Sequence, residues 1–530
     1  MSLQTITLIL AFVTGFLSLS LEIIWFRIVD FTREGLPETF GYVLGAFLIG
    51  IAFGALIAGR LSLQKNLNVF KLTACLLISA TFLSCFSIPL VAQVITVSYP
   101  VGLALCLLFI ALVACAFGVI FPLLCHVTIG SNESIGRKVS YIYLANILGA
   151  TISPLVTGFY LLDHFDLSTI VAAIATISAL ASVVLYAGSS SSVKQKLVFA
   201  VGTLALSAVL LLANTSLYEN IFAKLQYKTN WSKTGPFTFP GGGPFKYVVE
   251  NRSGLITVKP STYGGDVIYG GGFYDGRFNI EPNFDANGIR RAFLVAALHK
   301  NPSEVLQIGL SSASWALVLD AYEPIKSFDI VEINHGYAEV IRHYPQHSRV
   351  LESDKAKVHF DDGRRWLNRN PDRKFDLIVM NVTFHGRNNA TNQLSVEYLE
   401  IVKSHLKPGG VAYYNATSSE DVFFTAAQVF KHIMKIDTFV AASDLPFGLN
   451  QQTVFDNLQK FTREPIKAMY QTRIHPPLFR KLSKTQLVDI GDRYRNRTDL
   501  VKITDDNMAT EFRRVSPMGG VSWISFLGKL

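Results

Sequence analysis

Long apolar stretches separated by short polar loops occupy the first ~215 residues, and shorter apolar runs of mixed type fill the remainder of the chain. A helix that crosses the hydrocarbon core of a bilayer needs about 20 apolar residues. By that measure the sequence predicts seven membrane-spanning helices, near residues 5–28, 39–60, 72–94, 99–129, 140–162, 168–187 and 196–214. The first stretch has no basic segment before it and further spans follow, so a cleaved signal peptide is not expected.

Basic residues are concentrated in the loops after the even-numbered predicted spans. These loops carry Arg60, Lys65, Lys71, Arg137, Lys138, Lys194 and Lys196. The odd-numbered loops carry only Arg27 and Arg33. Because basic loops stay in the cytoplasm, we expect a multi-pass integral membrane protein, in a bacterial inner membrane, whose C-terminal part is extracytoplasmic. Lysines at 224, 228 and 233 favour the opposite orientation and keep a cytoplasmic location open.

The C-terminal part begins with β-type runs and continues with alternating strands and helices. Short runs at 247–250, 254–259 and 267–269 predict a small antiparallel sheet, with Asp275–Gly276 as a hairpin turn. A helical pattern follows at 285–300. We therefore predict a transmembrane helical domain (1–214), a linker (215–245), a small β subdomain (246–284), an α/β domain (285–455) and a basic C-terminal extension (456–530).

Five buried-type strands alternate with helices in the predicted α/β domain. The strands are expected at 305–309, 328–333, 357–362, 375–381 and 411–415. Such alternation is typical of a parallel, Rossmann-like sheet that binds its ligand at the carboxyl ends of the strands.

Four residues at these strand ends are candidates for ligand contacts. The loop after Gly309 would cradle a ligand, and Glu332 is placed to hold ribose hydroxyls. Asp362 ends the third strand, where a carboxylate can meet an adenine amine. Asn381 ends the fourth strand, where chemistry would take place.

Charge and cysteine usage narrow the possible functions. The net charge is +9, and the C-terminal part carries most of it. The charge of that part is spread out rather than clustered in runs, which favours a solubilising surface near anionic lipid over nucleic-acid binding. All five cysteines lie before residue 126, so no cysteine-based metal site is expected in the C-terminal part, and no metal is predicted.

The chain resembles the membrane-fused branch of the spermidine synthase (polyamine aminopropyltransferase) family over nearly its whole length. In the apolar half the resemblance rests on residues 21–27 (LEIIWFR), on the glycines at 45, 50, 54 and 59, and on residues 143–149 (YLANILG). In the C-terminal half it rests on 274–276 (YDG), 331–333 (VEI), 362–367 (DGRRWL), 398–410 and 504–507 (TDDN).

The resemblance implies transfer of an aminopropyl group from decarboxylated S-adenosylmethionine to a diamine. In that reaction a carboxylate after the fourth strand accepts a proton from the attacking amine. Asn381 stands at that position and cannot act as a base, and His385 is the nearby titratable group, most simply a solvated loop histidine. The side chains that follow Gly309 would crowd the donor, and Arg290–Arg291 would repel a polyamine.

Three functional hypotheses follow. The first is a degenerate, non-catalytic or repurposed domain, anchored in the lipid bilayer, that binds a ligand, a membrane-protein partner or a second copy of itself. The second is an active aminopropyltransferase, or another S-adenosylmethionine-dependent transferase, with an altered acceptor. The third is a transport-associated module, based on the polar span residues Glu22 and Asn146. Glu22 can also be read as an interfacial anchor beside a snorkelling Arg27.

Overall fold

The computed structural model of the 530-residue chain describes residues 3–64, 67–128, 135–231, 242–381, 384–417, 419–470, 475–484 and 487–512. The chain forms two compact units. The first comprises Met1–Glu34, Glu38–Phe245 and Glu250–Leu255, and the second comprises Gly35–Pro37, Lys246–Val249 and Ile256–Leu530.

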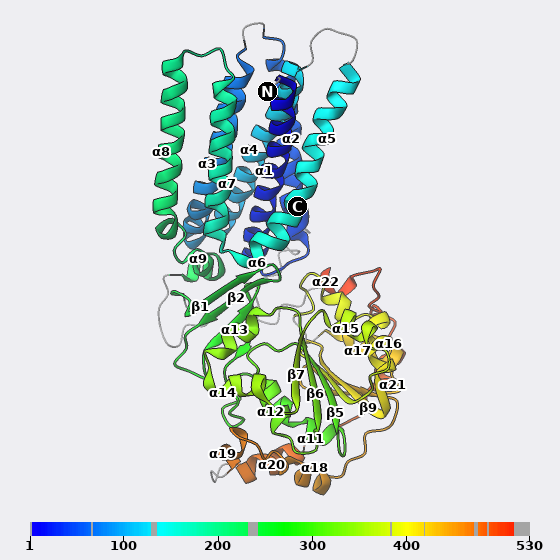
Figure 1. The fold of residues 1–530 in the computed structure, drawn as a ribbon. Coiled ribbons are helices and arrows are strands. Elements are labelled where there is room, and N and C mark those ends of the chain that lie inside the picture. Colours follow the sequence, from blue (N-terminus) through cyan, green and yellow to red (C-terminus); the bar gives the residue numbers. More distant parts are fainter. Residues whose placement is uncertain are drawn as a thin grey trace. The chain divides into compact units, whose positions relative to one another are not determined.

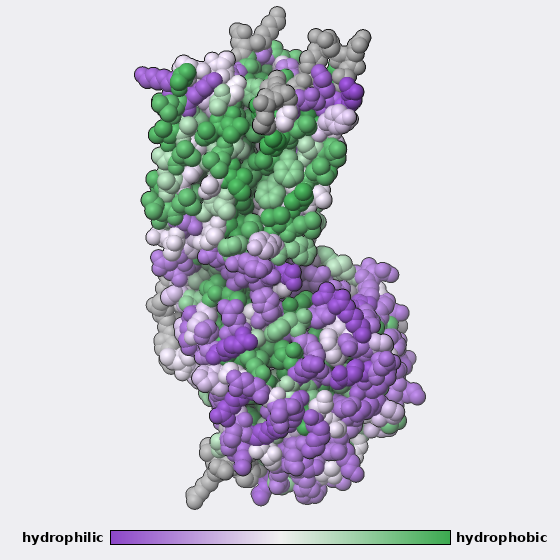
Figure 2. All heavy atoms as spheres, in the orientation of Figure 1, coloured by the Kyte–Doolittle hydropathy of each residue, from purple (hydrophilic) through white to green (hydrophobic). Residues whose placement is uncertain are grey.

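In the described part of the first unit, seven helices are long and apolar enough to cross a membrane, and they match the seven predicted stretches in number and position. They are α1 (Leu3–Thr32), α2 (Glu38–Leu61), α3 (Val69–Val97), α4 (Tyr99–Thr128), α5 (Ile135–Ser153), α7 (Leu167–Ala187) and α8 (Val193–Leu217) (Figure 1). Apolar residues cover most of the face of this bundle that Figure 2 shows, as expected for helices that face lipid. The shorter segments η1 (Pro154–Leu161), a π-helix, and α6 (Leu162–His164) prolong α5, and α9 (Ile221–Tyr227) follows α8.

Two of the glycines in α2 allow close packing against α4. A Cβ atom at Gly50 would lie 2.3 Å from the carbonyl oxygen of Ala111, and one at Gly54 would lie 2.1 Å from that of Cys115. Small residues allow helix backbones to approach this closely in a membrane. A Cβ atom at Gly45 or at Gly59 would meet no neighbouring atom within 4 Å. The predicted packing role therefore holds for Gly50 and Gly54.

Two polar side chains of the bundle bond to other elements of the first unit. Asn146 Nδ2 in α5 donates to the carbonyl oxygen of Ala11 in α1 at 3.0 Å, which gives it a packing role. Arg27 is 9% exposed and its Nη1 donates to the carbonyl oxygen of Asn251 at 2.9 Å, with Glu250 at 3.7 Å. The idea that Arg27 snorkels toward lipid headgroups is therefore wrong, because its guanidinium is paired within the first unit.

A small sheet has four strands in the order β1-β2-β3-β4, and most of its residues belong to the second unit. The strands are β1 (Tyr247–Asn251), β2 (Gly254–Lys259), β3 (Val267–Gly270) and β4 (Phe273–Arg277). The predicted hairpin turn at Asp275–Gly276 is wrong, because both residues lie within β4. The turn is formed by Gly271 and Gly272, with φ of +56° and +80°, values that glycine adopts without steric cost.

The larger sheet has seven strands in the order β10-β11-β9-β8-β5-β6-β7. They are β5 (Glu304–Ile308), β6 (Ser327–Glu332), β7 (Ala356–Phe360), β8 (Phe375–Met380), β9 (Leu406–Asn415), β10 (His432–Ile436) and β11 (Phe439–Ser443). Strands β5 to β9 pair in parallel, which confirms the predicted Rossmann-like fold. The antiparallel β10–β11 hairpin extends the sheet beyond β9 and was not predicted.

Helices link the strands and cover the sheet (Figure 1). They are α12 (Ser314–Ala321), α13 (Gly336–Arg342), α14 (Pro345–Ser348), α15 (Gly363–Arg369), α16 (Val396–Ser404) and α17 (Glu420–Val429). The predicted helix at 285–300 is two short helices instead, α10 (Arg290–Phe293) and α11 (Val295–Leu298). The described part of the C-terminal extension forms the short helices α18 (Gln451–Leu458), α19 (Ile466–Tyr470), α20 (His475–Ser483), α21 (Gly491–Arg495) and α22 (Ala509–Phe512).

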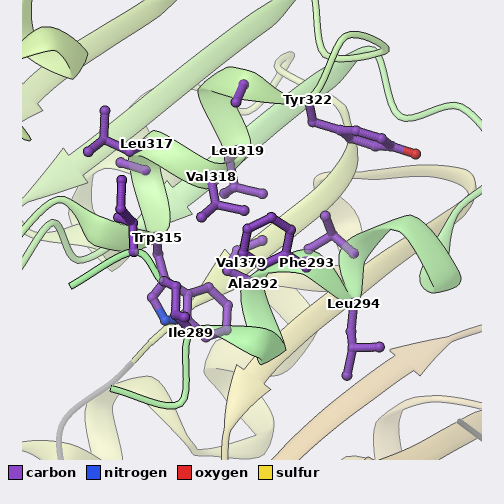
Figure 3. Packing of buried hydrophobic residues seen from close by; sticks show 14 of the residues in the cluster. Ile289, Ala292, Phe293, Leu294, Trp315, Leu317, Val318, Leu319, Tyr322 and Val379 are labelled. Carbon is purple, nitrogen blue, oxygen red and sulfur yellow. The ribbon is translucent and has the colours of Figure 1, made fainter. Parts of the chain in front are cut away.

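Buried aliphatic and aromatic side chains of α10 and α12 pack together near Val379 of β8 (Figure 3). Trp315 of α12 stacks on Phe439 of β11, with ring centroids 5.2 Å apart. Phe293 of α10 packs against Phe461 with centroids 5.0 Å apart, and both side chains are fully buried. Burial of each aromatic side chain contributes roughly 2–3 kcal/mol, so this core holds the first βα loop in place above the sheet.

Substitution of Gly54 by leucine should destabilise the first unit, because the new side chain would overlap α4. We expect a fall of roughly 5 °C or more in the melting temperature of the full chain in detergent, from an overpacking cost of about 1–3 kcal/mol. Gly45→Leu is the matched control, since a Cβ atom there meets nothing within 4 Å. Equal melting temperatures for the two variants would contradict the packing role.

Candidate functional site

The four predicted site residues lie at the carboxyl ends of adjacent strands. Gly309 follows β5, Glu332 ends β6, Asp362 follows β7 and Asn381 follows β8. Ile308 at the end of β5 pairs in register with Val331 of β6 and with Met380 of β8. The carboxyl ends of these three strands are therefore level with one another. The fold thus brings together residues that lie up to 72 positions apart in the sequence, between Gly309 and Asn381.

The loop after Gly309 uses strained backbone and is fixed to β4. Gly309 has a φ of +92°, and Ser311 and Ala313 also have positive φ values, of +51° and +62°. Such conformations cost of order 1–3 kcal/mol for residues with a side chain and are typical of functional loops. The Ser311 hydroxyl donates to the carbonyl oxygen of Asp275, and those of Ser312 and Ser314 donate to that of Arg277. These three hydroxyl groups are directed at β4, whereas crowding of a donor by the side chains after Gly309 stays a prediction.

Glu332 ties this loop to the end of β6. Its carboxylate accepts hydrogen bonds from the backbone N–H of Leu310 at 2.7 Å and from that of Asn334 at 2.9 Å. The residue is 5% exposed. Burial raises the pKa of Glu332 to about 7, because the charged form is poorly solvated there, and the nearby Asp275 carboxylate adds to the increase.

A partly buried acidic group that sequence reasoning missed lies beside the same loop. Asp275 in β4 is hydrogen-bonded to the Tyr337 hydroxyl and attracted by Arg387. Burial raises its pKa to about 6. A Cβ atom at Gly270 would lie 2.3 Å from the Tyr337 hydroxyl, so glycine there leaves room for this contact. The Asp–Gly pair at 275 was interpreted as a turn, which concealed Asp275 as a partly buried acid.

Asp362 caps helix α15 from its position after β7. Its Oδ1 accepts a hydrogen bond from the backbone N–H of Arg365 at 2.8 Å, and the residue remains half-buried. A side-chain oxygen at this position satisfies one of the free N–H groups at the helix start. The neighbouring Asp361 pairs with Arg365 and Arg369. One Asp362 oxygen is thus committed to the helix, which leaves its second oxygen to meet a ligand.

Asn381 and His385 belong to a polar network between the ends of β8 and β9. Asn381 Oδ1 accepts a hydrogen bond from Asn415 Nδ2 at 3.4 Å. His385 Nδ1 lies 2.5 Å from the Thr417 hydroxyl oxygen, which also accepts the His385 backbone N–H at 3.1 Å. His385 is 1% exposed, so the interpretation as a solvated loop histidine is wrong. Burial lowers its pKa to about 4, although the Asp421 carboxylate opposes this effect.

The two arginines expected to repel a polyamine are bound to neighbouring groups. Arg290 Nε donates to the carbonyl oxygen of Pro282 and its guanidinium lies 3.6 Å from Asp285. Arg291 donates to the Thr438 hydroxyl and lies over the ring of Phe439. Both guanidinium groups therefore have structural partners, and the expectation that they face a ligand is not supported.

No group of three or more His, Cys, Asp or Glu side chains that could hold a metal ion occurs among the described residues. The site consists instead of a strained loop, two strand-end carboxylates and a neutral network. Carboxylates at the ends of β6 and β7 are acceptors for the hydroxyl and amine groups of a nucleoside. The group after β8 can donate and accept hydrogen bonds but supplies no carboxylate base.

Comparison with known proteins identifies the family of this domain. Residues 292–455 match the model of the spermine/spermidine synthase domain. A polyamine aminopropyltransferase of Streptococcus uberis is 39% identical over 88 residues, which cover 16% of this chain and 30% of that protein. One of Aeropyrum pernix is 24% identical over 161 residues, or 28% of this chain and 51% of that protein. The chain thus spans about a third to a half of the length of these relatives.

The solved structures that this chain matches include a spermidine synthase in complex with the transition-state analogue AdoDATO. It has a TM-score of 0.36 and 15% identity, and the match covers 45% of this chain and 88% of that one. Human methyltransferase-like protein 13 in complex with SAH has a TM-score of 0.28 and 20% identity, over 35% of this chain and 96% of that one.

The raised pKa of Glu332 predicts that the contribution of this residue to the stability of the second unit falls as the pH rises. The native state holds this proton up to about pH 7, whereas the unfolded chain loses it near pH 4.5. The stabilisation is therefore complete below pH 4.5 and is lost as the pH rises through 7, by up to about 3 kcal/mol. Asp275 contributes a decline in the same direction, from pH 3.8 to about 6.

Pulse proteolysis of the full chain in urea between pH 5 and pH 8 measures this slope. Relative to Glu332→Gln, the parent chain should lose stability between pH 5 and pH 7, because an amide does not titrate. The slope is the readout, since the amide also disturbs the hydrogen bonds to Leu310 and Asn334 at every pH. Parallel slopes for the two proteins would show that Glu332 does not hold this proton.

Proposed function

Because residues 292–455 form a spermine/spermidine synthase domain, we propose that the protein is a membrane-anchored member of that group that binds an adenosine-type nucleoside without transferring an aminopropyl group to a diamine. The ligand is S-adenosylmethionine, its decarboxylated form or a thioether product of either. One combination of features carries the proposal. The strand ends retain the carboxylates of Glu332 and Asp362, which can accept hydrogen bonds from a nucleoside, but the end of β8 has a neutral network where a base would be needed.

The nucleoside half of the proposal rests on the ends of β5, β6 and β7. Glu332 and the free oxygen of Asp362 present carboxylates to the edge where Gly309 turns the chain. Glu332 would accept hydrogen bonds from ribose hydroxyls, and Asp362 one from the adenine amine. The Gly309 loop would lie against the sulfur-bearing end of the ligand.

The loss of transfer rests on the end of β8. An attacking ammonium must first lose a proton, and the transition state gains from a base held at that position. Asn381 does not accept a proton, and His385 uses Nδ1 for Thr417 and is fully buried. A second candidate is an active transferase with another acceptor, which the naming of the similar proteins as polyamine aminopropyltransferases favours.

A binding and turnover assay on the full chain in nanodiscs tests the proposal. Calorimetric titration should detect binding of S-adenosylmethionine or of its decarboxylated form. Asp362→Ser should weaken that binding roughly tenfold, as expected for one lost charged hydrogen bond. Serine keeps an acceptor at the helix start, which separates ligand binding from capping. Incubation with the decarboxylated compound and putrescine should release no 5′-methylthioadenosine. Product formation that depends on putrescine would favour the second candidate.

We also propose that the second unit lies on the outer side of the membrane, on the basis of the basic loops after the even-numbered spans. Alkaline phosphatase fused after Leu530 should then be active in a bacterial host, and green fluorescent protein at the same point should be dark. The reverse result would overturn this placement and put the second unit in the cytoplasm.

A further inference from the structure

The network at the ends of β8 and β9 lies directly beside the loop assigned to the nucleoside. A Cβ atom at Gly309 would lie 3.6 Å from the main-chain oxygen of Asn381. The last residue of β5, Ile308, pairs in register with Met380, the residue before Asn381. A second ligand held by this network would therefore be adjacent to the reactive end of the nucleoside.

The network has the features of a built site. Thr417 has a φ of +46°, which is rare for a β-branched residue and costs of order 1–3 kcal/mol. Its N–H donates to Asn415 Oδ1 at 2.9 Å, and its hydroxyl bonds to both Nδ1 and the N–H of His385. Among the described residues, the Nδ2 group of Asn381 has no hydrogen-bond partner. The strained loop thus orients a hydroxyl and leaves one amide donor available.

The groups of the network carry no charge at neutral pH. Amides and hydroxyls do not ionise in this range, and burial keeps the His385 imidazole neutral because it lowers the pKa to about 4. The charged neighbours are Asp421 and Arg387. Asp421 is 7% exposed and its Oδ1 accepts the N–H of Val501 at 2.9 Å. Arg387, two residues after His385, adds a positive charge to the same loop and is drawn to Asp275.

We propose that the ends of β8 and β9 form a subsite for an uncharged ligand bearing hydroxyl or amide groups, held beside the nucleoside by Asn381, Asn415 and Thr417. The inference rests on the proposed nucleoside site and names the chemistry of its second ligand. An ammonium group entering this subsite would lose hydration without gaining a carboxylate, which is costly, whereas a hydroxyl exchanges its water hydrogen bonds for those of two amides. His385 is a positioning residue, because it holds the Thr417 hydroxyl.

Two probes with the same carbon chain test this discrimination. 1,4-Butanediol and 1,4-diaminobutane are compared by saturation-transfer NMR on the full chain in nanodiscs with 5′-methylthioadenosine present. We expect saturation of the diol and at least tenfold less of the diamine. Asn381→Asp should reverse this preference, because it supplies the missing carboxylate. Asn368→Asp, which adds the same charge at an exposed position of α15, should leave the preference unchanged.

Equal saturation of the two probes in the parent chain would overturn the inference, as would an Asn381→Asp variant with an unchanged preference. The adenine resonances of 5′-methylthioadenosine report nucleoside binding in the same samples. If the adenine resonances show no saturation, the proposed nucleoside binding is contradicted. The ratio of diol saturation to diamine saturation still tests the subsite in that case. Saturated adenine resonances in each variant also show that its fold is intact.

Discussion

The hydrogen bond from the Leu310 N–H to the buried Glu332 carboxylate is the interaction on which the site depends. It joins the first βα loop to the second parallel strand and so sets the shape of the edge where a ligand would bind. The cost of burying this carboxylate appears as a pKa of about 7. Two backbone N–H donors offset that cost only in part, so the group is ready to gain further donors, such as ribose hydroxyls.

The same loop also connects the small sheet to the large one. Its serine hydroxyls bond to carbonyl oxygens of β4, and its positive φ values are maintained by those bonds. The loop is therefore fixed by protein contacts on one side and by Glu332 on the other. This arrangement differs from a glycine-rich loop, in which the backbone is free of side chains and a ligand completes the structure.

Much of the fold could be predicted, because apolar runs of characteristic length determine it. The seven spans and the parallel strands follow directly from such runs, and Glu332 and Asp362 were placed by counting strand ends. Prediction from short sequence motifs was wrong where one motif is compatible with two structures. An Asp–Gly pair commonly marks a hairpin turn, yet the neighbouring Gly271–Gly272 pair fills that role and Asp275 becomes a partly buried acid.

Contacts between distant residues could not be predicted. The burial of His385 depends on Thr417, 32 residues away, and no pattern near His385 indicates that partner. The Arg291 guanidinium reaches Thr438, 147 residues along the chain, so its paired state was equally hidden. Helix packing in the first unit was also hidden from the sequence. Gly50 and Gly54 pack against α4 but Gly45 does not, since sequence spacing does not specify which face of α2 meets α4.

The most direct test of the central claim is a cryo-electron microscopy structure of the full chain in nanodiscs with 5′-methylthioadenosine. The account predicts the nucleoside at the ends of β5, β6 and β7, with its ribose hydroxyls bonded to Glu332 and its adenine amine near Asp362. An unoccupied strand edge at saturating nucleoside, or a nucleoside bound elsewhere on the chain, would contradict it.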